Sequence, residues 1–255
     1  EKLIVENENE IAAVIIEPVV MGAAGAWIYP PEYVGWLRKL CDKHGLLLIA
    51  DEIATGLGRT GRWLACDHAS VVPDILCLGK ALTGGTLPLS ATIVTEKIYD
   101  AFRSTAGPGA QNRMLYHGHT FCGNPIACAA SLAALEIFEK DKIIERSAPA
   151  ALAMGIGLAR LAKQYSCIRQ WRAIGMVGVL EIDPAFSGES DPTQAAAGNA
   201  GVALAARIGR EALGLGLFLR PLGLSVYLWP PLTTSVEEME TILGLLGEAF
   251  QRATG

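Results

Sequence analysis

Two short apolar runs, each followed by a charged residue, constrain the fold of this chain most strongly. The first run covers residues 46–50 and is followed by Asp51, and the second covers residues 75–79 and is followed by Lys80. Short apolar runs bounded by turn residues are typical of strands buried on both faces of a parallel sheet. Because ligands of open α/β sheets bind beyond the carboxyl ends of the strands, we expect Asp51 and Lys80 to lie at a ligand site.

The chemical types of these two residues point to one kind of site, although each has ordinary alternatives. A pyridoxal phosphate (PLP) site requires an amine that forms a Schiff base with the aldehyde and a carboxylate that keeps the ring nitrogen protonated. Lys80 interrupts an apolar context, so we expect its amine to be partly desolvated. A strand-end acid can instead cap a following helix or pair with a lysine, and a lysine can extend its amine into solvent. The two residues alone leave these alternatives open.

Both segments resemble the class III, fold-type-I aminotransferases. The similarity lies in LLLIADEIATGLGRTGR (46–62) and PDILCLGKALTGGTLPLSA (73–91), and it extends from about residue 10 to the C-terminus. It implies a PLP-dependent aminotransferase in which Lys80 and Asp51 are the catalytic residues. Lys80 carries the cofactor as a Schiff base, and Asp51 pairs with the pyridine nitrogen. Glu52 points to the opposite face of its strand and is expected to be structural, and Arg59 is assigned no chemistry.

A further segment, YHGHTFCGNP (116–125), also matches the family. In the family this segment crosses a dimer interface and binds the cofactor phosphate of the other subunit. The resemblance implies a homodimer with shared active sites, in which His119 and Thr120 bind the cofactor and Gly118 lies beside the substrate. Small residues, a hydroxyl and free amides suit an anion, but the segment could also be only the entry turn of a helix. The spacing His117-x-His119-x-x-Cys122 has no second cluster to complete four ligands, so we expect no metal.

Two residues near the C-terminus complete the candidate site. Residues 217–221 read as a turn and residues 225–229 as the return strand of a hairpin. An arginine at such an edge is usually just solvated. Arg220, however, aligns with the family arginine that holds the substrate carboxylate, which a planar guanidinium can do with two hydrogen bonds, and Tyr227 on the return strand is expected to support it. The resemblance therefore makes Lys80, Gly118, Arg220 and Tyr227 the expected substrate-binding residues.

The predicted fold class is α/β, a fold-type-I PLP transferase. A parallel-rich sheet belongs to the C-terminal part of a large domain, residues 1–146, and a small α+β domain covers residues 147–255. The glycine/serine loop and the aromatic ring with which the family grips the phosphate and stacks on the pyridine are not found in this sequence. We therefore expect this chain to be the C-terminal part of a longer enzyme and to be inactive alone.

The resemblance also narrows the reaction. Residues 73–91 are most similar to members that convert 8-amino-7-oxononanoate to 7,8-diaminononanoate in biotin biosynthesis, with S-adenosylmethionine as the expected amino donor and lysine as the donor of some members. His119 stands where these members usually have proline, and histidine is more usual in other class III members. A transaminase for ω-amino acids or amines, using pyruvate or 2-oxoglutarate, is therefore an alternative. A catalytically silent fragment or binding module that keeps the fold is an alternative of another class.

The composition limits the partners. The net charge of −5 and the absence of clustered basic residues argue against nucleic acid. No apolar run reaches the length of a membrane span, and the chain opens without a charged-then-apolar leader. The six cysteines lie mostly in apolar segments and are expected to be reduced thiols. We expect a cytoplasmic protein that acts on small-molecule substrates.

Overall fold

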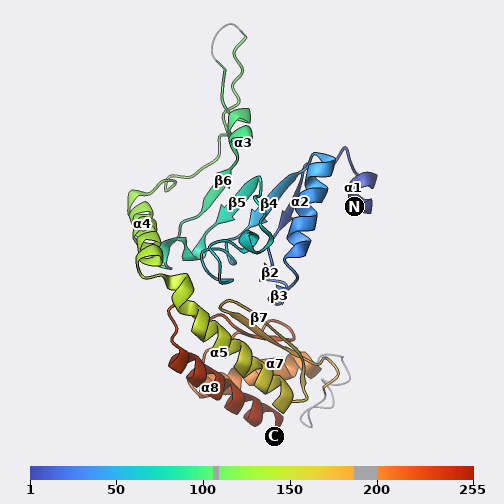
Figure 1. The fold of residues 1–255 in the computed structure, drawn as a ribbon, viewed down its shortest axis with the longest axis vertical. Helices are drawn as coiled ribbons and strands as arrows, with labels where there is room; N and C mark the ends of the chain where they lie inside the picture. Colours follow the sequence, from blue (N-terminus) through green and yellow to red (C-terminus); the bar gives the residue numbers. More distant parts are fainter. Residues whose placement is uncertain (106–108, 187–199) are drawn as a thin grey trace. The chain divides into compact units, whose positions relative to one another are not determined.

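The computed structural model describes residues 1–105, 109–186 and 200–255, which form two compact units (Figure 1). The chain enters the second unit three times, and two of these entries are short stretches from the first quarter of the sequence. The division of the chain into domains at residue 146 stays a proposal, and that position lies within helix α5 (Ile143–Gln164). The first unit comprises Glu1–Val19, Tyr29–Leu57 and Leu64–Lys140, and the second comprises Val20–Ile28, Gly58–Trp63 and Asp141–Gly255.

The first unit is built on a four-stranded sheet with the strand order β1–β4–β5–β6. Strands β1 (Ala13–Ile16), β4 (Leu47–Asp51) and β5 (Ile75–Leu78) run parallel, whereas β6 (Ala91–Val94) runs antiparallel to β5. The two apolar runs of the sequence are therefore neighbouring parallel strands. The predicted parallel-rich α/β sheet is confirmed.

Helix α2 (Glu32–His44) packs on β4 and buries one of its sides. Its buried residues are Val34, Leu37, Leu40 and Cys41, which recur at the spacing of one helical face. The helix starts just after two prolines, with Glu32 in its first turn, and it ends at Gly45 in the left-handed conformation. These signals are local, which is why the sequence predicts both ends of this helix correctly.

An ion pair fixes the start of β5 to its neighbours. Asp74 accepts a hydrogen bond from the Leu48 N–H at 2.8 Å and forms an ion pair with Arg38 of α2 at 2.6 Å. Partial burial acts to raise the pKa of Asp74, but the Leu48 hydrogen bond and the Arg38 guanidinium outweigh it and lower this pKa. Asp74 thereby ties β5, β4 and α2 together just before the strand that leads to Lys80.

Shorter elements complete the first unit. Helix α4 packs against the 3₁₀ turn η2 that begins at Lys80. Among the helices that the structure describes, none has both the length and the hydropathy needed to cross a bilayer. The remaining elements are α1 (Lys2–Glu6), η1 (Ala65–Ala69), η2 (Lys80–Thr83), α3 (Glu96–Ala101) and α4 (Pro125–Lys140).

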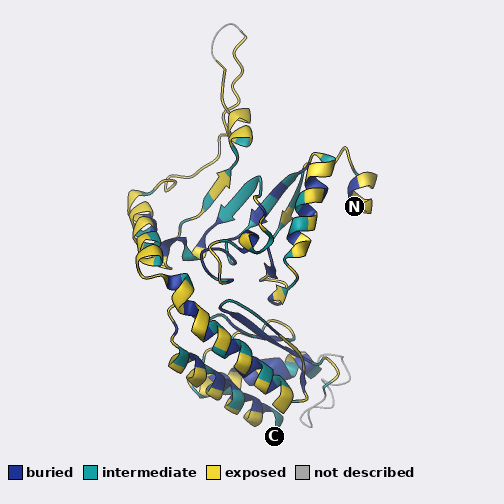
Figure 2. Cartoon of the chain, in the orientation of Figure 1, coloured by how far each residue is buried: buried dark blue, intermediate teal, exposed yellow. Residues whose placement is uncertain are grey.

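The second unit is a three-stranded antiparallel sheet with helices on one face. Helices α5 and α7 pack on the sheet, and α8 packs against both. Figure 2 shows these helices buried where they meet the core and exposed on the outside. The elements are α5 (Ile143–Gln164), β7 (Ile168–Ile174), β8 (Val177–Ile182), α7 (Ala200–Gly214), β9 (Ser225–Leu228) and α8 (Val236–Thr254).

A small hairpin also belongs to this unit. Strands β2 (Val20–Met21) and β3 (Trp27–Ile28) pair antiparallel, and β3 contacts β7. Strands of two residues are too short for an alternating pattern, so the sequence does not predict them. The hairpin is the first of the two short stretches that the chain sends into the second unit.

Replacing Asp74 by asparagine is expected to lower the free energy of unfolding near neutral pH by about 1–3 kcal/mol, because the Leu48 N–H and Arg38 lose a charged acceptor. Since the folded-state pKa of Asp74 is lowered, its stabilising contribution is present above the unfolded-state value, which is 3.8 for an ordinary aspartate. The contribution is lost as the pH falls through the lowered folded-state value. Urea unfolding of both proteins, at neutral pH and below pH 3.8, measures this difference.

The matched control is Asp100→Asn, which removes an exposed carboxylate on α3 that is paired with the exposed Arg103 beyond the end of this helix. Its effect on the free energy of unfolding is expected to stay within about 0.5 kcal/mol. Equal losses in the two variants, or an Asp74→Asn loss that does not shrink at acid pH, would contradict this role of Asp74.

Candidate active site

The carboxyl ends of β4 and β5 adjoin, which brings Asp51 and Lys80 to the same edge of the sheet. Asp51 pairs in parallel register with Cys77, and the following Glu52 N–H donates to the Cys77 carbonyl at 2.9 Å. Lys80 follows Cys77 by three residues and is the first residue of η2. The prediction that the two residues end neighbouring strands is confirmed, while their chemical roles stay predictions.

Asp51 is half-buried at the last position of β4. Its Oδ1 accepts a hydrogen bond from the Ile53 N–H at 3.1 Å, which engages one of its two carboxylate oxygens. Burial raises the pKa of the Cys77 thiol, and the charge of Asp51 adds to this effect. This coupling agrees with the register, because residues paired in a parallel sheet place their side chains on the same face.

Glu52 lies on the opposite face and fixes the chain beyond the strand end. Its carboxylate is only 1% exposed and accepts hydrogen bonds from the Ala65 N–H at 2.6 Å and the Cys66 N–H at 2.8 Å. Burial raises the pKa of Glu52 in spite of these two bonds. Glu52 is therefore structural, as predicted, and it holds the η1 turn in place.

Lys80 lines a pocket of about 1080 Å³ within the first unit. Its backbone φ is +44°, in the left-handed region that residues with a side chain seldom adopt and that is enriched at functional sites. The Lys80 side chain is exposed, so the expected partial desolvation of its amine is not observed in this chain. The reason is its position, because Lys80 begins the turn beyond β5 and does not lie within the buried strand.

Another part of the lining of this pocket comes from the segment before α4. His119, Phe121 and Asn124 line it together with Lys80. The His119 ring is oriented by the Phe121 N–H, which donates to its Nδ1 at 3.1 Å. The structure therefore joins Lys80 and His119 in one pocket. Among the described residues, no group of three or more His, Cys, Asp and Glu side chains could hold a metal ion.

Thr120 and Gly118 are exposed and do not line the pocket of their own chain. They are therefore not part of the lining of this pocket, and neither is Asp51. The pocket also has walls that the sequence did not indicate, namely Leu87, Pro88 and Leu89. Single apolar residues in a loop give no periodic signal, and the loop is held by the Thr83 hydroxyl, which donates to the Leu87 carbonyl at 2.6 Å.

Arg220 and Tyr227 belong to the second unit, where Arg220 is exposed and Tyr227 is half-buried. The predicted hairpin is wrong, since β9 pairs with β8, while Leu222 only forms an isolated bridge with Ser225. Pro221 explains this, because its missing N–H disfavours a strand beside β9. Tyr227 pairs with a residue of β8 and has its ring 6.4 Å from that of Trp229, edge to face. The placement of Arg220 and Tyr227 toward Lys80 stays a prediction.

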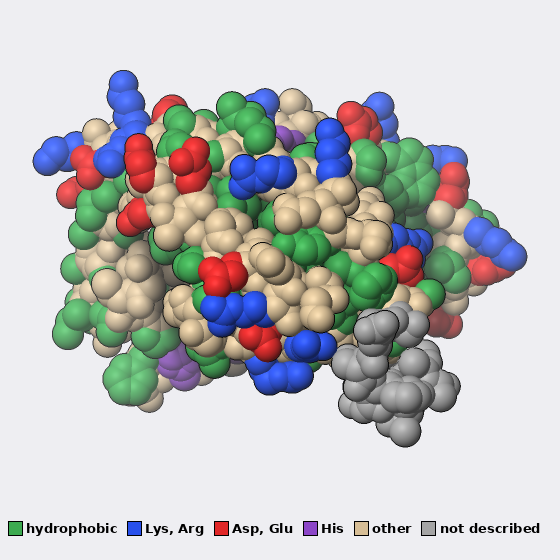
Figure 3. Space-filling model, turned by 90° about the horizontal axis from the view of Figure 1, so that it is seen from below, with side chains coloured by type: hydrophobic (Ala, Val, Ile, Leu, Met, Phe, Trp, Pro, Cys, Tyr) green, Lys and Arg blue, Asp and Glu red, His purple; other side chains and the backbone are tan. Residues whose placement is uncertain are grey.

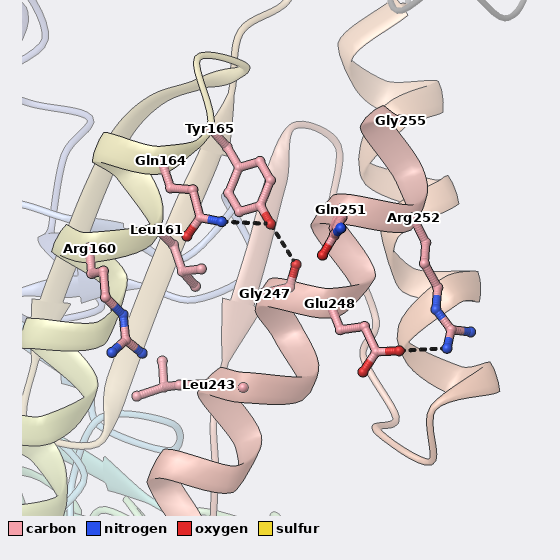
Figure 4. Close-up of a pocket in the computed structure, with 11 residues that line it drawn as sticks. Arg160, Leu161, Gln164, Tyr165, Leu243, Gly247, Glu248, Gln251, Arg252 and Gly255 are labelled. Carbon is pink, nitrogen blue, oxygen red and sulfur yellow. Dashed lines mark hydrogen bonds and ion pairs between the residues drawn. The ribbon is translucent and has the colours of Figure 1, made fainter.

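A second pocket, of about 790 Å³, lies between α5 and α8 in the second unit (Figure 4). Its polar groups are largely engaged with one another. Glu248 and Arg252 form an ion pair at 2.6 Å, and the Tyr165 hydroxyl donates to the Gly247 carbonyl at 2.8 Å. The face drawn in Figure 3 likewise carries acidic and basic side chains interspersed. The first unit's pocket, with its strained lysine, is the stronger candidate.

Comparison with known proteins decides the family. Residues 1–250 match the family model described as aminotransferase class-III. The chain belongs to the class III aminotransferases. Among class III relatives, it is 39% identical over 245 residues to the adenosylmethionine-8-amino-7-oxononanoate aminotransferase of Nitratidesulfovibrio vulgaris, covering 95% of this chain and 43% of that protein. The protein of the same name from Methanocaldococcus jannaschii is 38% identical over 256 residues, covering 98% of this chain and 53% of the relative.

Solved class III structures share the fold. The crystal structure of the M. jannaschii enzyme superposes with a TM-score of 0.85 at 36% identity, covering 98% of this chain and 56% of that one. An amine transaminase from an uncultivated Pseudomonas species, solved in its PLP-bound form, also gives 0.85 at 36% identity, with 100% and 55% covered. The fold-type-I assignment is thereby confirmed. The chain spans about half the length of the relatives that it matches.

Proposed function

We propose that this class III chain supplies the lysine and the carboxylate of a PLP-dependent aminotransferase. The observation that carries the proposal is the pairing of β4 with β5, which puts Asp51 and Lys80 at adjoining strand ends. An exposed amine and a half-buried carboxylate at one sheet edge have the chemistry that this cofactor requires. Family membership over residues 1–250 supports the same conclusion.

The residues of the first unit fit the cofactor. The pocket beside Lys80 has a volume in the range of small-molecule sites. Lys80 would hold PLP through its Nζ, and Asp51 would pair with the ring nitrogen. When bound, PLP supplies an aldehyde and an electron-accepting ring.

Each side chain then has a defined task. Asp51 keeps a proton on the ring nitrogen, because an adjacent negative charge favours the protonated form. The free Lys80 amine would move a proton from and back to the substrate carbon as a general base and acid. His119, which also lines the pocket, would lie beside the cofactor.

A homodimer with shared active sites is part of the proposal. Large apolar side chains on the segment before α4 and on α4 itself are exposed, with Tyr116 as the extreme at 78%. Extended exposed apolar surface of this kind marks protein interfaces. Thr120 lies within this segment and outside its own chain's pocket, which agrees with a role at the phosphate of the partner's site. The other exposed apolar residues are Leu115, Phe121, Ile126 and Leu132.

The proposed acceptor is 8-amino-7-oxononanoate and the proposed donor is S-adenosylmethionine, which makes the reaction a step of biotin biosynthesis. The names of the relatives from N. vulgaris and M. jannaschii support this substrate. Arg220 would hold the acceptor's carboxylate in a bidentate pair, with Tyr227 and Gly118 beside the substrate.

The second candidate is a transaminase for amines or ω-amino acids that uses pyruvate or 2-oxoglutarate. Two observations favour it, namely His119 in the pocket wall and the equal identity and TM-score of the Pseudomonas amine transaminase. A catalytically silent binding module is the third possibility, and the Lys80 variant below separates it from both enzymes.

The complete natural polypeptide is expected to bind PLP with the visible absorbance of a lysine-linked cofactor, and Lys80→Ala is expected to lack this band. The variant should also lose at least about 100-fold in kcat, because it lacks the general base and acid. Spectra and rates are compared with those of Lys140→Ala, which removes an exposed lysine at the end of α4 and should behave as wild type. A silent protein would show no band in either variant or in wild type.

We expect amino transfer to 8-amino-7-oxononanoate with S-adenosylmethionine as donor. We expect little transfer from simple amines to pyruvate or 2-oxoglutarate. The physical reason is the position of the acid, because Arg220 would hold a carboxylate several carbons from the reacting carbonyl. Pyruvate has its only carboxylate next to the carbonyl, and the distal carboxylate of 2-oxoglutarate lies closer to the carbonyl than that of the oxononanoate. Product formation is followed by chromatography with each donor and acceptor pair, with lysine as a further donor. Efficient transfer from amines to pyruvate, with none to the oxononanoate, would favour the second candidate.

Replacing Arg220 by lysine is expected to lower kcat/KM for carboxylate-bearing acceptors by about 10-fold or more, because lysine keeps the charge but loses one of the two charge-assisted hydrogen bonds, each worth about 1.5–3 kcal/mol. An aldehyde acceptor without a carboxylate should react within about twofold of the wild-type rate, since it never made that pair. Arg210→Lys, at an exposed position of α7, is the matched control. Equal losses for both kinds of acceptor would contradict a carboxylate-binding role.

A further inference from the structure

Glu52, the residue directly after β4, has all of its polar groups engaged within the first unit. Its N–H donates to the Cys77 carbonyl at 2.9 Å, and its own carbonyl accepts from the Gly56 N–H at 3.0 Å. One oxygen of its carboxylate accepts from the Ala65 N–H and the other from the Cys66 N–H. Glu52 therefore joins the end of β4 to β5 and to the η1 turn.

The Glu52 carboxylate is enclosed on more than one side. A Cβ atom built on Gly56 would lie 2.9 Å from the Glu52 carbonyl oxygen and 3.2 Å from its Oε2, so the chain turns back closely over this side chain. Burial raises the pKa of the Cys66 thiol, and the charge of Glu52 and its hydrogen bond with this thiol add to the effect. The thiol therefore keeps its proton for the carboxylate. Because the surroundings are this close, a change in the hydrogen bonds of the carboxylate must be taken up by the backbone of Glu52.

The end of β4 depends on these bonds because the pairing with β1 stops before it. The register of β1 with β4 ends at Ile16 and Ala50, whereas the register of β5 with β4 continues to Cys77 and Asp51. Beyond Ala50 the chain is held by its bonds to β5 and by the two bonds of the Glu52 carboxylate to η1.

The two neighbours of Glu52 in the chain are the residues that present the proposed catalytic acid. Asp51 precedes it, and the Ile53 N–H that orients the Asp51 carboxylate follows it. Ile53 also lines the pocket of Lys80, and a Cβ atom built on Gly79 would lie 3.3 Å from its Cγ2. Since planar peptides leave only two soft torsions per residue, a shift of the Glu52 backbone moves both neighbours.

We propose that Glu52 is a positioning residue for Asp51. By accepting two N–H groups of η1, its carboxylate fixes the backbone from which Asp51 and Ile53 project, and thereby the direction in which Asp51 presents its second oxygen. This inference rests on the proposed function, in which Asp51 pairs with the ring nitrogen of PLP, and it goes beyond the structural role of Glu52 at the η1 turn. Glu52 lies on the face opposite to Asp51, so it acts through the backbone and not by contact with the cofactor.

The test compares Glu52→Gln with Asp67→Ala in the complete natural polypeptide loaded with PLP. Glu52→Gln keeps the size of the side chain but replaces one acceptor oxygen by an NH₂ group, which cannot accept from an N–H. Asp67 is exposed, and its carboxylate accepts from the Leu64 N–H at 2.9 Å at the start of the same turn. Asp67→Ala therefore also removes an acceptor that holds η1, and the comparison separates a looser η1 from a displaced Asp51.

Three changes are expected in Glu52→Gln. Hydrogen exchange at the Ile53 amide should become at least about tenfold faster, because its acceptor is Asp51. The value of kcat should fall about tenfold with KM for the amino donor within about twofold, since a small misplacement of a catalytic group affects the chemical step. The pH at which the visible band of the lysine-linked cofactor titrates should shift by at least about 0.5 unit, because the charge of Asp51 lies differently beside the ring. Asp67→Ala should match wild type in all three measurements.

A wild-type value of any of the three measurements in Glu52→Gln would overturn the inference. Faster exchange with an unchanged kcat, for example, would make Glu52 an anchor without influence on the chemistry of Asp51. Equal changes in Glu52→Gln and Asp67→Ala would overturn it as well, because the effect would then come from η1 as a whole.

If Glu52→Gln does not fold, Ala65→Pro removes a single N–H donor from the same contact. Ala65 is the first residue of η1, where proline is tolerated, and Leu64 before it is extended, with φ −122° and ψ 147°, as a residue before proline is. This variant should give smaller changes of the same kind, and wild-type behaviour would contradict the role of Glu52. A wild-type protein that carries no lysine-linked PLP overturns the proposed function itself, and this result is visible before any variant is compared.

Discussion

The parallel pairing of β4 with β5 is the constraint on which the candidate site depends. The pairing sets Asp51 opposite Cys77, three residues before Lys80. Side chains alternate between the faces of a strand, so a slip by one residue would turn Asp51 to the face that Glu52 now occupies. Asp74 opposes such a slip, because its carboxylate binds the Leu48 N–H from the position just before β5. This contact at the start of β5 thereby helps to keep Asp51 and Glu52 on their present faces of the sheet.

What the sequence predicts well in this fold is encoded locally. The apolar runs, the proline-led start of α2 and its end at Gly45 each depend on neighbouring residues, and all are found as expected. The pairing of β9 with β8 and the hairpin that lies on β7 depend on residues far apart in the chain. The hydrophobic periodicity of a short stretch of sequence cannot report contacts between distant residues. This is why the predicted hairpin near Arg220 is wrong.

The candidate site likewise contains residues that the sequence indicates and residues that it does not. Asp51 and Lys80 could be found because a charged residue directly after a buried strand conflicts with its surroundings and therefore needs a reason. Leu87 and Asn124 line the same pocket without any such conflict, and no local pattern marks them. The exposure of Lys80 was also missed, because it follows from a left-handed backbone at the first residue of η2 and not from the apolar residues around it.

Arg59 shows a third use of a charged residue, besides chemistry and solvation. Burial disfavours its charge, and neutral carbonyls and a ring offset this cost where a carboxylate might be expected. Such compensation is directional, because dipoles stabilise a cation only in the right geometry, whereas a carboxylate would attract it from many. The Arg59 side chain therefore holds its loop only in the one position in which the carbonyl dipoles point at the guanidinium.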